Sequence, residues 1–383
     1  MRRVLALTAI RSEYFLSRAL FQAIDAHPGL ELELVVAGAH LSPHHGHTVR
    51  AIEADGFRIV DRIESLLYSD RDAARIKGAA LELQILSHIV DARRPDWLLA
   101  TTDREEPMML ALCGAYMNIP VAHYGAGDRV VGNVDDMVRH SISRLAHLHL
   151  TTHEEARERL IRSGEQPWRV HNVGHSGIDR IRAAPVLAPD RLAEVLGVPA
   201  VDGPYVIVIQ HPLSSEIDQA GAQMRETLEA VRALGLPAFV SYPNSDAGGQ
   251  AMIEVIRSFE GTPGMHVFRN IPDTAFVNLL RGAGLLIGNS SMGLLEAPYL
   301  KLGVINVGNR QTARHHAANV FFVPHERQAI LRQARLMLDD PATRAGIAQC
   351  ANPFGDGRSG ERVAALLATT PLDERLRNKD LTY

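Results

Sequence analysis

Small polar and charged residues gather between positions 285 and 314 of this 383-residue chain. Ser290 and Ser291 follow the apolar run 285–287, where a buried strand is expected to end and a helix to begin. The first amides of a helix have no partner within it, and they form the positive end of the helix dipole. A strand–turn–helix of this kind with small residues at the turn can bind an anion such as a diphosphate.

Three further residues of this segment have suitable chemistry. Glu296 is expected one to two turns into the helix, where a carboxylate could accept hydrogen bonds from the two hydroxyls of a ribose. Arg310 and Arg314 lie four residues apart and can share one face as a second clamp on phosphate or carboxylate. Each residue alone also has an ordinary structural explanation. Their ordered combination favours a nucleotide diphosphate site.

The first half of the chain places polar residues after apolar runs. The runs at 4–8, 97–101 and 119–123 predict buried strands. In a parallel sheet, ligands bind beyond the carboxyl ends of the strands. The residues expected there are Arg11, Asp103, Arg104, His123 and Asp128. Asp135 begins a later helix, where the helix dipole alone would also favour an acidic residue.

Strands and helices alternate along the whole chain, which predicts two Rossmann-like halves with mostly parallel sheets facing one another across a cleft. We expect a first domain at 1–172 and a second at 173–357. In the second half, the strands at 205–209 and 238–242 end in loops that contain His211 and Asn244. No G-x-G-x-x-G follows the first strand, so a bound dinucleotide is not indicated.

Composition narrows the function classes. A net charge of -4 argues against a broad nucleic-acid or anionic-membrane surface. No segment approaches the roughly 18 apolar residues of a membrane span. The short apolar run near the N-terminus is interrupted by Arg11 before it reaches the length of a signal-peptide core. Cys113 and Cys350 are too few and too distant for a disulfide framework, and the 18 histidines show no metal-ligand spacing. We therefore expect a cytoplasmic protein without a metal.

Taken in order, these motifs resemble those of the hydrolysing UDP-N-acetylglucosamine 2-epimerases, especially the branch that supplies N-acetylmannosamine-type sugars for sialic and legionaminic acids. The resemblance covers about 4–357. Its most specific segments are Ala37-Gly-Ala-His-Leu-Ser, Thr102-Asp-Arg-Glu, Val134-Asp-Asp-Met-Val-Arg-His140, Gln210-His-Pro-Leu-Ser-Ser-Glu216, Pro243-Asn-Ser-Asp-Ala-Gly248 and Gly288-Asn-Ser-Ser.

The resemblance implies a GT-B-like pair of domains, with a last helix at 358–383 that returns to the first domain. The first domain would take the sugar and the second the nucleotide diphosphate. Ser290 and Ser291 would hold phosphate, Glu296 the ribose, and Arg11 with Arg310 would complete the diphosphate site. The remaining residues expected to bind nucleotide or sugar are Arg104, His123, Asn244, Asp246 and Arg314.

The family reaction removes the C2 proton of the sugar, expels the nucleoside diphosphate from C1, and adds water to the resulting glycal with inversion at C2. Such chemistry needs a base near C2, an acid or a cation at the leaving phosphate, and a group that manages the water. By position, Asp103 and Asp135 would be the acid/base carboxylates, and His211 would lie at the leaving group. No cofactor is implied. The family also suggests a homodimer.

One position departs from the family. Where the family has a glutamate in a His-x-Glu-x-Gly loop, this chain has Gly125 in His123-Tyr-Gly-Ala-Gly. Loss of a positioned acid or base typically costs roughly 10²–10⁴-fold in rate. Asp128 and Tyr124 are the two candidates for its replacement. The alternatives to a 2-epimerase are therefore a non-epimerising hydrolase, a GT-B glycosyltransferase, and a nucleotide-sugar-binding protein that has lost its chemistry.

Overall fold

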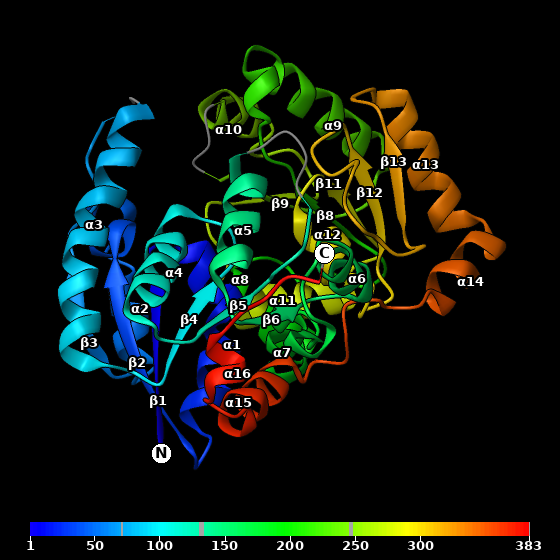
Figure 1. Cartoon of the computed structure of the whole chain (residues 1–383). Coiled ribbons are helices and arrows are strands. Elements are labelled where there is room, and N and C mark those ends of the chain that lie inside the picture. Colours follow the sequence, from blue (N-terminus) through cyan, green and yellow to red (C-terminus); the bar gives the residue numbers. More distant parts are fainter. Residues whose placement is uncertain (70–71, 130–133, 245–247, 383) are drawn as a thin grey trace. The chain divides into compact units, whose positions relative to one another are not determined.

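The computed structural model describes residues 1–69, 72–129, 134–244 and 248–382. The chain forms two compact units (Figure 1). The first consists of Met1–Arg182 and the C-terminal segment from Phe354, and the second of Ala183–Pro353. Each unit contains one sheet, and the strand pairs in both sheets are parallel.

The sheet of the first unit has the order β3-β2-β1-β4-β5-β6-β7. Its strands are β1 (Arg2–Thr8), β2 (Leu30–Ala37), β3 (Ile59–Ile63), β4 (Trp97–Thr101), β5 (Val121–Tyr124), β6 (Leu148–Thr151) and β7 (Val170–Asn172). Strands β1, β2, β4, β5 and β6 are buried along almost their whole length, as expected for a parallel sheet that is covered on both faces. The predicted strands match these elements closely, with differences of one or two residues at their ends.

Alternate residues of the first sheet enter two different cores. Val4 and Ala6 pack on the side of α1 and α15, whereas Leu5 and Leu7 pack on the side of α3, α4 and α5. The helices of this unit are α1 (Arg11–Asp25), α2 (Val49–Ala54), α3 (Asp72–Arg93), α4 (Glu105–Met117), α5 (Val134–Leu145), α6 (Glu154–Arg162), α7 (Ser176–Ala183), α15 (Ser359–Thr369) and α16 (Glu374–Arg377). Its short 3-10 turns are η1 (Gly38–Leu41), η2 (Pro43–His45) and η3 (Pro167–Arg169).

The sheet of the second unit has the order β10-β9-β8-β11-β12-β13. Its strands are β8 (Val206–Ile209), β9 (Ala238–Ser241), β10 (Met265–Phe268), β11 (Leu285–Gly288), β12 (Gly303–Val307) and β13 (Val320–Val323). Its helical elements are α8 (Pro189–Leu196), η4 (Ser214–Gln219), α9 (Ala220–Leu234), α10 (Gly249–Arg257), α11 (Asp273–Gly282), α12 (Ser291–Leu295), α13 (Arg327–Asp339) and α14 (Pro341–Gln349). Helices α9, α10 and α13 pack on one face of this sheet.

Each sheet has a point at which the strand order reverses. This point lies between β1 and β4 in the first unit and between β8 and β11 in the second. In open α/β sheets, the loops that leave the two strands on either side of such a point diverge, and the space between them receives the ligand. The segments directly after these four strands contain the predicted site residues Arg11, Asp103, Arg104, His211, Ser290 and Ser291.

Helix α12 is shorter than the sequence predicts. It ends at Leu295, and Glu296 is its C-terminal cap rather than a residue one to two turns inside a helix. Proline at 298 explains the early end, because proline has no amide hydrogen and disfavours helical geometry in the residue before it. A five-residue helix has only a small dipole, so the anion site that the sequence predicts here would depend more on side chains than on this helix.

The C-terminal segment belongs to the first unit. Helix α15 packs against α1, and Figure 1 shows the two side by side. The Asp179 carboxylate of α7 accepts hydrogen bonds from the first amides of α15, Ser359 N at 3.0 Å and Gly360 N at 2.8 Å. This contact holds α7 in the first unit. The observed boundary after Arg182 therefore lies beyond the expected boundary at 172.

Substituting Gly360 tests how closely α15 packs on α1. A Cβ atom at this position would lie 2.8 Å from Ala23 Cβ and 2.9 Å from Ala19 O. We expect Gly360→Ala to lower the free energy of unfolding by about 1–3 kcal/mol because of overpacking. The control Gly346→Ala in α14, where a Cβ would have no neighbour within 4 Å, should raise it by about 0.5–1 kcal/mol. Urea denaturation measures both changes, and equal effects would contradict close packing.

Candidate functional site

Arg139 connects the loops that follow β4 and β5 in the first unit. Its side chain is only 6% exposed; it forms an ion pair with Asp103 through Nη2 and donates to Gly125 O through Nη1 at 2.8 Å. Asp103 comes from the loop after β4, and Gly125 directly follows β5. A buried guanidinium with these two acceptors fixes the separation of the two loops.

Asp135 lies near Asp103 at the start of α5, and the two carboxylates have different surroundings. Burial raises the pKa of Asp135, and the negative charge of Asp103 raises it further. The positive charges of Arg75, Arg104 and Arg139 oppose this effect. Asp103 itself is ion-paired with Arg139. Two nearby carboxyl groups in such different environments are the usual arrangement of an acid and a base in one site.

Thr102 gives the loop after β4 its direction. Its φ angle is 69°, in the left-handed region where a β-branched residue is strained. The backbone is held there by hydrogen bonds from Thr102 N to Tyr124 O at 2.9 Å and from His123 Nε2 to Thr102 O at 2.8 Å. Strain of this kind next to Asp103 indicates a functional loop.

His123 joins β5 to the loop after β4 and to α5. Its ring is fully buried, and burial lowers its pKa to about 3. Nε2 donates to Thr102 O at 2.8 Å, and Nδ1 accepts from the Ser143 hydroxyl at 3.0 Å. Both ring nitrogens therefore bind protein groups, and the ring holds the backbone that precedes Asp103. The predicted contact of His123 with substrate stays a prediction.

The backbone explains why glycine stands at position 125. The φ angle of Gly125 is 80°, which L-amino acids rarely adopt, so a glutamate here would be strained. Tyr124, one candidate for the missing acid, is buried, and its hydroxyl bonds to Ser176 Oγ at 3.0 Å and Gly174 O at 3.3 Å. These bonds tie β5 to the segment around the start of α7. They leave Tyr124 in a structural position.

Asp128, the other candidate, contacts a histidine. The His153 ring donates from Nε2 to Asp128 Oδ1 at 3.3 Å, and its Nδ1 accepts from Ala156 N at 3.3 Å. Asp128 is only 6% exposed. The adjacent Gly127 packs so closely on α6 that a Cβ would lie 2.6 Å from Ala156 O. Helix α6 therefore fixes this loop, and Asp128 belongs to a buried Asp–His pair.

Arg104 pairs with glutamates of its own helix. Its guanidinium lies 3.1 Å from Glu106 and 3.5 Å from Glu105. Arg75 of α3 holds Glu105 with two bonds of 2.6 Å each and approaches Asp135 to 3.9 Å. The sequence predicted a ligand contact for Arg104 and gave no signal for Arg75, because nothing in the pattern places α3 beside the start of α5.

Two buried glutamates lie below this network. Glu13 accepts from the Thr101 hydroxyl at 2.8 Å, and Glu82 accepts from the Ser65 hydroxyl at 2.8 Å. Burial raises the pKa of each to about 8, and the charge of Glu106 adds to the effect. The first unit thus concentrates carboxyl groups at the carboxyl end of β1 and β4. Sequence reasoning missed these two glutamates, which look like ordinary helix residues.

Asn289 organises the corresponding edge of the second unit. Its side chain accepts from His211 N at 2.7 Å and donates to His211 O at 2.9 Å, which joins the loops after β11 and β8. His211 Nδ1 accepts from Asn244 N at 3.1 Å, so the ring proton is on Nε2. Burial and, to a smaller extent, the charge of Arg310 lower the pKa of His211 to about 3. The ring is therefore a neutral hydrogen-bond donor at neutral pH.

Arg310 also lies at this edge. Arg310 Nη1 and Gln311 Nε2 each donate to Asn289 O at 3.1 Å. Arg314 Nη1 approaches Gln311 Oε1 at 3.4 Å, so the two predicted arginines are joined through Gln311. Ser290 is the N-terminal cap of α12, where its side chain makes no capping bond. Asn289 belongs to the Gly288-Asn-Ser-Ser motif, but no role was predicted for it from the sequence.

The structure thus gathers the predicted residues in two groups, one in each unit. Asp103 and Asp135 form the core of the first, and His211, Asn244 and Arg310 of the second. Arg11 is exposed at the start of α1, over the ring of Phe15 at 5.6 Å. Ser291 and the 3%-exposed Glu296 flank α12, and Asp246 lies outside the described residues.

Known proteins resemble this chain along most of its length. The family model described as UDP-N-acetylglucosamine 2-epimerase matches residues 22–368. A Legionella pneumophila protein named UDP-N,N'-diacetylbacillosamine 2-epimerase (hydrolyzing) is 32% identical over 383 residues, which is all of both chains. A Campylobacter jejuni protein named GDP/UDP-N,N'-diacetylbacillosamine 2-epimerase (hydrolyzing) is 30% identical over 83% of each chain.

Solved structures support the fold. The UDP-GlcNAc 2-epimerase of Methanocaldococcus jannaschii, solved with UDP-GlcNAc and UDP, aligns with a TM-score of 0.75 at 15% identity, over 96% of this chain and 99% of that one. The predicted class of two Rossmann-like, GT-B-like units is confirmed. Among the described residues, no helix combines the length and apolar character that crossing a bilayer requires.

Replacing Thr102 tests the backbone strain. We expect Thr102→Gly to raise the free energy of unfolding by about 0.5–2 kcal/mol, because relief of the left-handed strain outweighs the added flexibility of glycine. Thr152 is the matched control: it also follows a strand, and its buried hydroxyl has no hydrogen-bond partner among the described residues, but its φ angle is not positive. Thr152→Gly should destabilise. Guanidinium denaturation measures the free energy of unfolding of both variants, and a lower value for Thr102→Gly than for wild type would contradict backbone strain at this position.

Replacing Glu13 tests the buried carboxyl groups. Its pKa rises from 4.5 to about 8 on folding, so its stabilising contribution is complete below pH 4.5 and is lost as pH rises through about 8. Glu13→Gln, which mimics the protonated form, should gain on the order of 1–3 kcal/mol over wild type at pH 8.5 and little at pH 5. The exposed Glu158→Gln serves as control. Urea midpoints across this range measure the difference, and a pH-independent difference would contradict the shift.

Proposed function

Because this chain belongs to the UDP-N-acetylglucosamine 2-epimerase family, we propose that it converts a UDP-activated 2-acetamido sugar into UDP and the free 2-epimer. The names of the relatives, which are hydrolysing 2-epimerases, support this activity. The structural observation that carries the proposal is the pairing of Asp103 and Asp135, two carboxyl groups in contrasting environments at the carboxyl edge of a parallel sheet.

The first unit carries out the proton chemistry at C2 in this proposal. Asp103, held by Arg139, accepts the C2 proton as the bond from C1 to the diphosphate breaks. Asp135, whose pKa is raised by burial and by Asp103, delivers a proton to the opposite face of C2 when water adds to C1. Delivery from the opposite face accounts for inversion. Arg11 and Arg104 supply positive charge at the same edge.

The second unit binds the diphosphate and the nucleoside. Arg310 supplies the positive charge for the leaving group, because the neutral His211 ring offers a hydrogen bond from Nε2 rather than a charge. Ser290 and Ser291 donate to phosphate oxygens, and Glu296 accepts from the ribose. The remaining residues of this unit that the family resemblance predicts to bind substrate are Asn244, Asp246 and Arg314.

The sugar we propose is a 2,4-diacetamido-trideoxyhexose rather than N-acetylglucosamine. The two relatives reported above both have N,N'-diacetylbacillosamine in their names, at 32% and 30% identity. A Neisseria meningitidis UDP-N-acetylglucosamine 2-epimerase is 29% identical over 86% of each chain, so the margin is small. The ratio of kcat/KM for the two UDP-sugars tests this choice, and a preference for UDP-N-acetylglucosamine would reverse it.

The other functions that the sequence left open are not favoured. A non-epimerising hydrolase, a glycosyltransferase and a binding protein have no counterpart in the names of the relatives reported above. We also propose that the enzyme is a cytoplasmic homodimer that needs no cofactor, and that its product enters sialic or legionaminic acid biosynthesis for cell-surface polysaccharide. Light scattering tests the dimer.

Reaction in deuterated water tests the activity. Protonation of the glycal at C2 comes from solvent, so the free sugar should contain one deuterium at C2 and have the inverted configuration. NMR of the free sugar measures both properties, and one equivalent of UDP should be released with it. A product that keeps hydrogen and its configuration at C2 would indicate plain hydrolysis, and an intact donor would indicate a binding protein.

Carboxamide variants test the acid and base. We expect Asp103→Asn and Asp135→Asn each to lower kcat by roughly 10²–10⁴-fold. The affinity for UDP, measured by calorimetry, should stay unchanged, because the residues proposed to bind the nucleoside belong to the second unit and both aspartates belong to the first. Asp128→Asn decides whether the Asp128–His153 pair takes part. A loss of the same size would add Asp128 to the acid/base residues, and a loss below about tenfold would leave it as a loop contact.

A further inference from the structure

The C-terminal tail of the chain enters the first unit beneath α5. Lys379 follows α16, and its ammonium donates to Ser143 O at 3.0 Å, Arg144 O at 3.0 Å and Ala146 O at 2.9 Å. These carbonyls belong to or directly follow the last turn of α5, where backbone acceptors have no partner within the helix. The Lys379 ammonium thus occupies the negative end of the α5 dipole.

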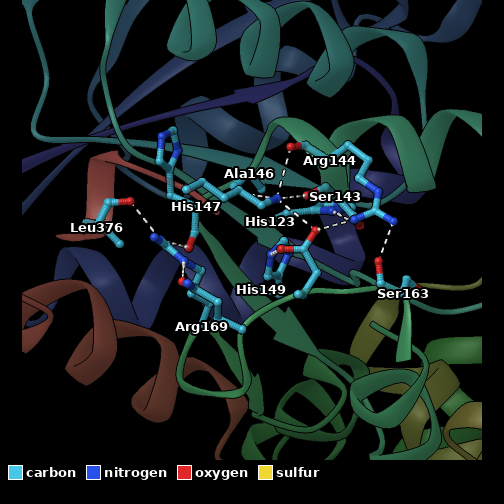
Figure 2. A network of polar contacts seen from close by, with 12 residues as sticks. His123, Ser143, Arg144, Ala146, His147, His149, Ser163, Arg169 and Leu376 are labelled. Carbon is cyan, nitrogen blue, oxygen red and sulfur yellow. Dashed lines mark hydrogen bonds and ion pairs between the residues drawn. The ribbon is translucent and has the colours of Figure 1, made fainter. Parts of the chain in front are cut away.

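A buried carboxylate balances this ammonium. Glu165 Oε1 lies 2.9 Å from Lys379 Nζ and accepts from Arg144 at 3.1 Å, while Oε2 accepts from His149 Nε2 at 2.9 Å. Glu165 is only 1% exposed, and the Lys379 side chain is 13% exposed. Figure 2 shows His149, Arg144 and Ala146 within this network. A surface lysine would not be enclosed in this way.

Arg169 holds the tail in place. Its fully buried guanidinium donates to the carbonyls of Leu376 at 2.8 Å and Arg375 at 2.6 Å on the tail, and to His147 O at 3.1 Å on the sheet side. The bond to Leu376 is visible in Figure 2. The tail is therefore fixed by its backbone, which delivers the Lys379 side chain to one defined position.

The same network reaches the candidate catalytic loop. Ser143, whose carbonyl binds Lys379, donates its hydroxyl to His123 Nδ1 at 3.0 Å, and these two residues are adjacent in Figure 2. His123 Nε2 donates to Thr102 O at 2.8 Å, directly before Asp103. Hydrogen bonds through Ser143 and His123 thus connect the tail to the Thr102 carbonyl, one residue before Asp103.

A second route runs through α5 itself. The end of this helix is fixed by Lys379, and its first turns carry Asp135 and Arg139, which is ion-paired with Asp103. Movement of α5 along its axis would change the separation of Asp103 and Asp135. Misplacement of reacting groups by about 1 Å can cost roughly 10²-fold in rate.

We propose that Lys379 is a positioning residue for the reaction: its ammonium fixes α5 and Ser143 so that Asp103 and Asp135 keep their relative positions. This inference rests on the proposed function for its effect on catalysis. It assigns to the last residues of the chain a role in the chemistry of the first sheet. A purely structural role would affect folding without changing turnover of the folded enzyme.

The test is Lys379→Met in the full-length enzyme, which keeps an unbranched side chain one atom shorter and removes the ammonium and its charge. We expect kcat to fall by about 10–100-fold at a temperature where circular dichroism shows a folded protein, with KM and UDP affinity within about twofold of wild type. The control Lys301→Met removes another lysine that donates to a backbone carbonyl, Cys350 O, in the second unit. It should leave kcat unchanged.

Chemical rescue separates the ammonium from general packing. Lys379→Cys, treated with 2-bromoethylamine, restores an ammonium at nearly the original length, and both native cysteines are buried. We expect the alkylated protein to regain most of the lost kcat. A wild-type kcat in Lys379→Met, a loss explained by the unfolded fraction, or failure of the ammonium to restore turnover would each overturn the proposal.

A readout independent of turnover keeps the two proposals apart. Carboxyl NMR titration of Asp135 should show its pKa moving down toward the ordinary value in Lys379→Met, because α5 no longer holds the carboxyl near Asp103. If wild-type enzyme released no sugar, the proposed function would fail while this titration still tested the positioning. An unchanged Asp135 titration would overturn the positioning itself.

Discussion

The first unit is organised around the constraint of keeping two carboxyl groups close together in a partly buried place. Like charges raise each other's proton affinity, and burial adds to the effect, so such a pair persists only with positive charges placed beside it. Arg139 provides the main compensation through its contact with Asp103, and Arg75 and Arg104 act on Asp135. The result is one ion-paired carboxylate and one with a raised pKa, which is what proton removal and return require.

The backbone around this pair is as specific as its charges. Thr102 and Gly125 both have positive φ angles, and hydrogen bonds from His123 and Arg139 hold the two loops in that form. The conformation of this loop therefore requires glycine at position 125. The family motif alone shows only that an acid is missing there. Burial of the Asp128–His153 pair against α6 follows from the same loop geometry.

In the second unit, hydrogen bonding rather than charge repulsion sets the geometry. Asn289 joins the loops after β8 and β11 by binding both backbone groups of His211, and Arg310 and Gln311 donate to its carbonyl. The neutral state of His211 follows from its burial. Arg310 and the small side chains of Ser290 and Ser291 therefore stand at this edge beside the five-residue helix α12.

The sequence by itself determined the class of fold, since apolar runs with period-two or helical spacing specify which segments bury which faces. It also determined which loops hold the candidate residues, because parallel strands bring their carboxyl ends to one edge. Only the tertiary structure decided which side chains meet. The contact of His123 with Thr102, the approach of Arg75 from α3, and the insertion of Lys379 beneath α5 all join residues distant in the chain. Local patterns contain no information about such contacts, because these contacts arise from packing between elements rather than from the preferences of any one segment.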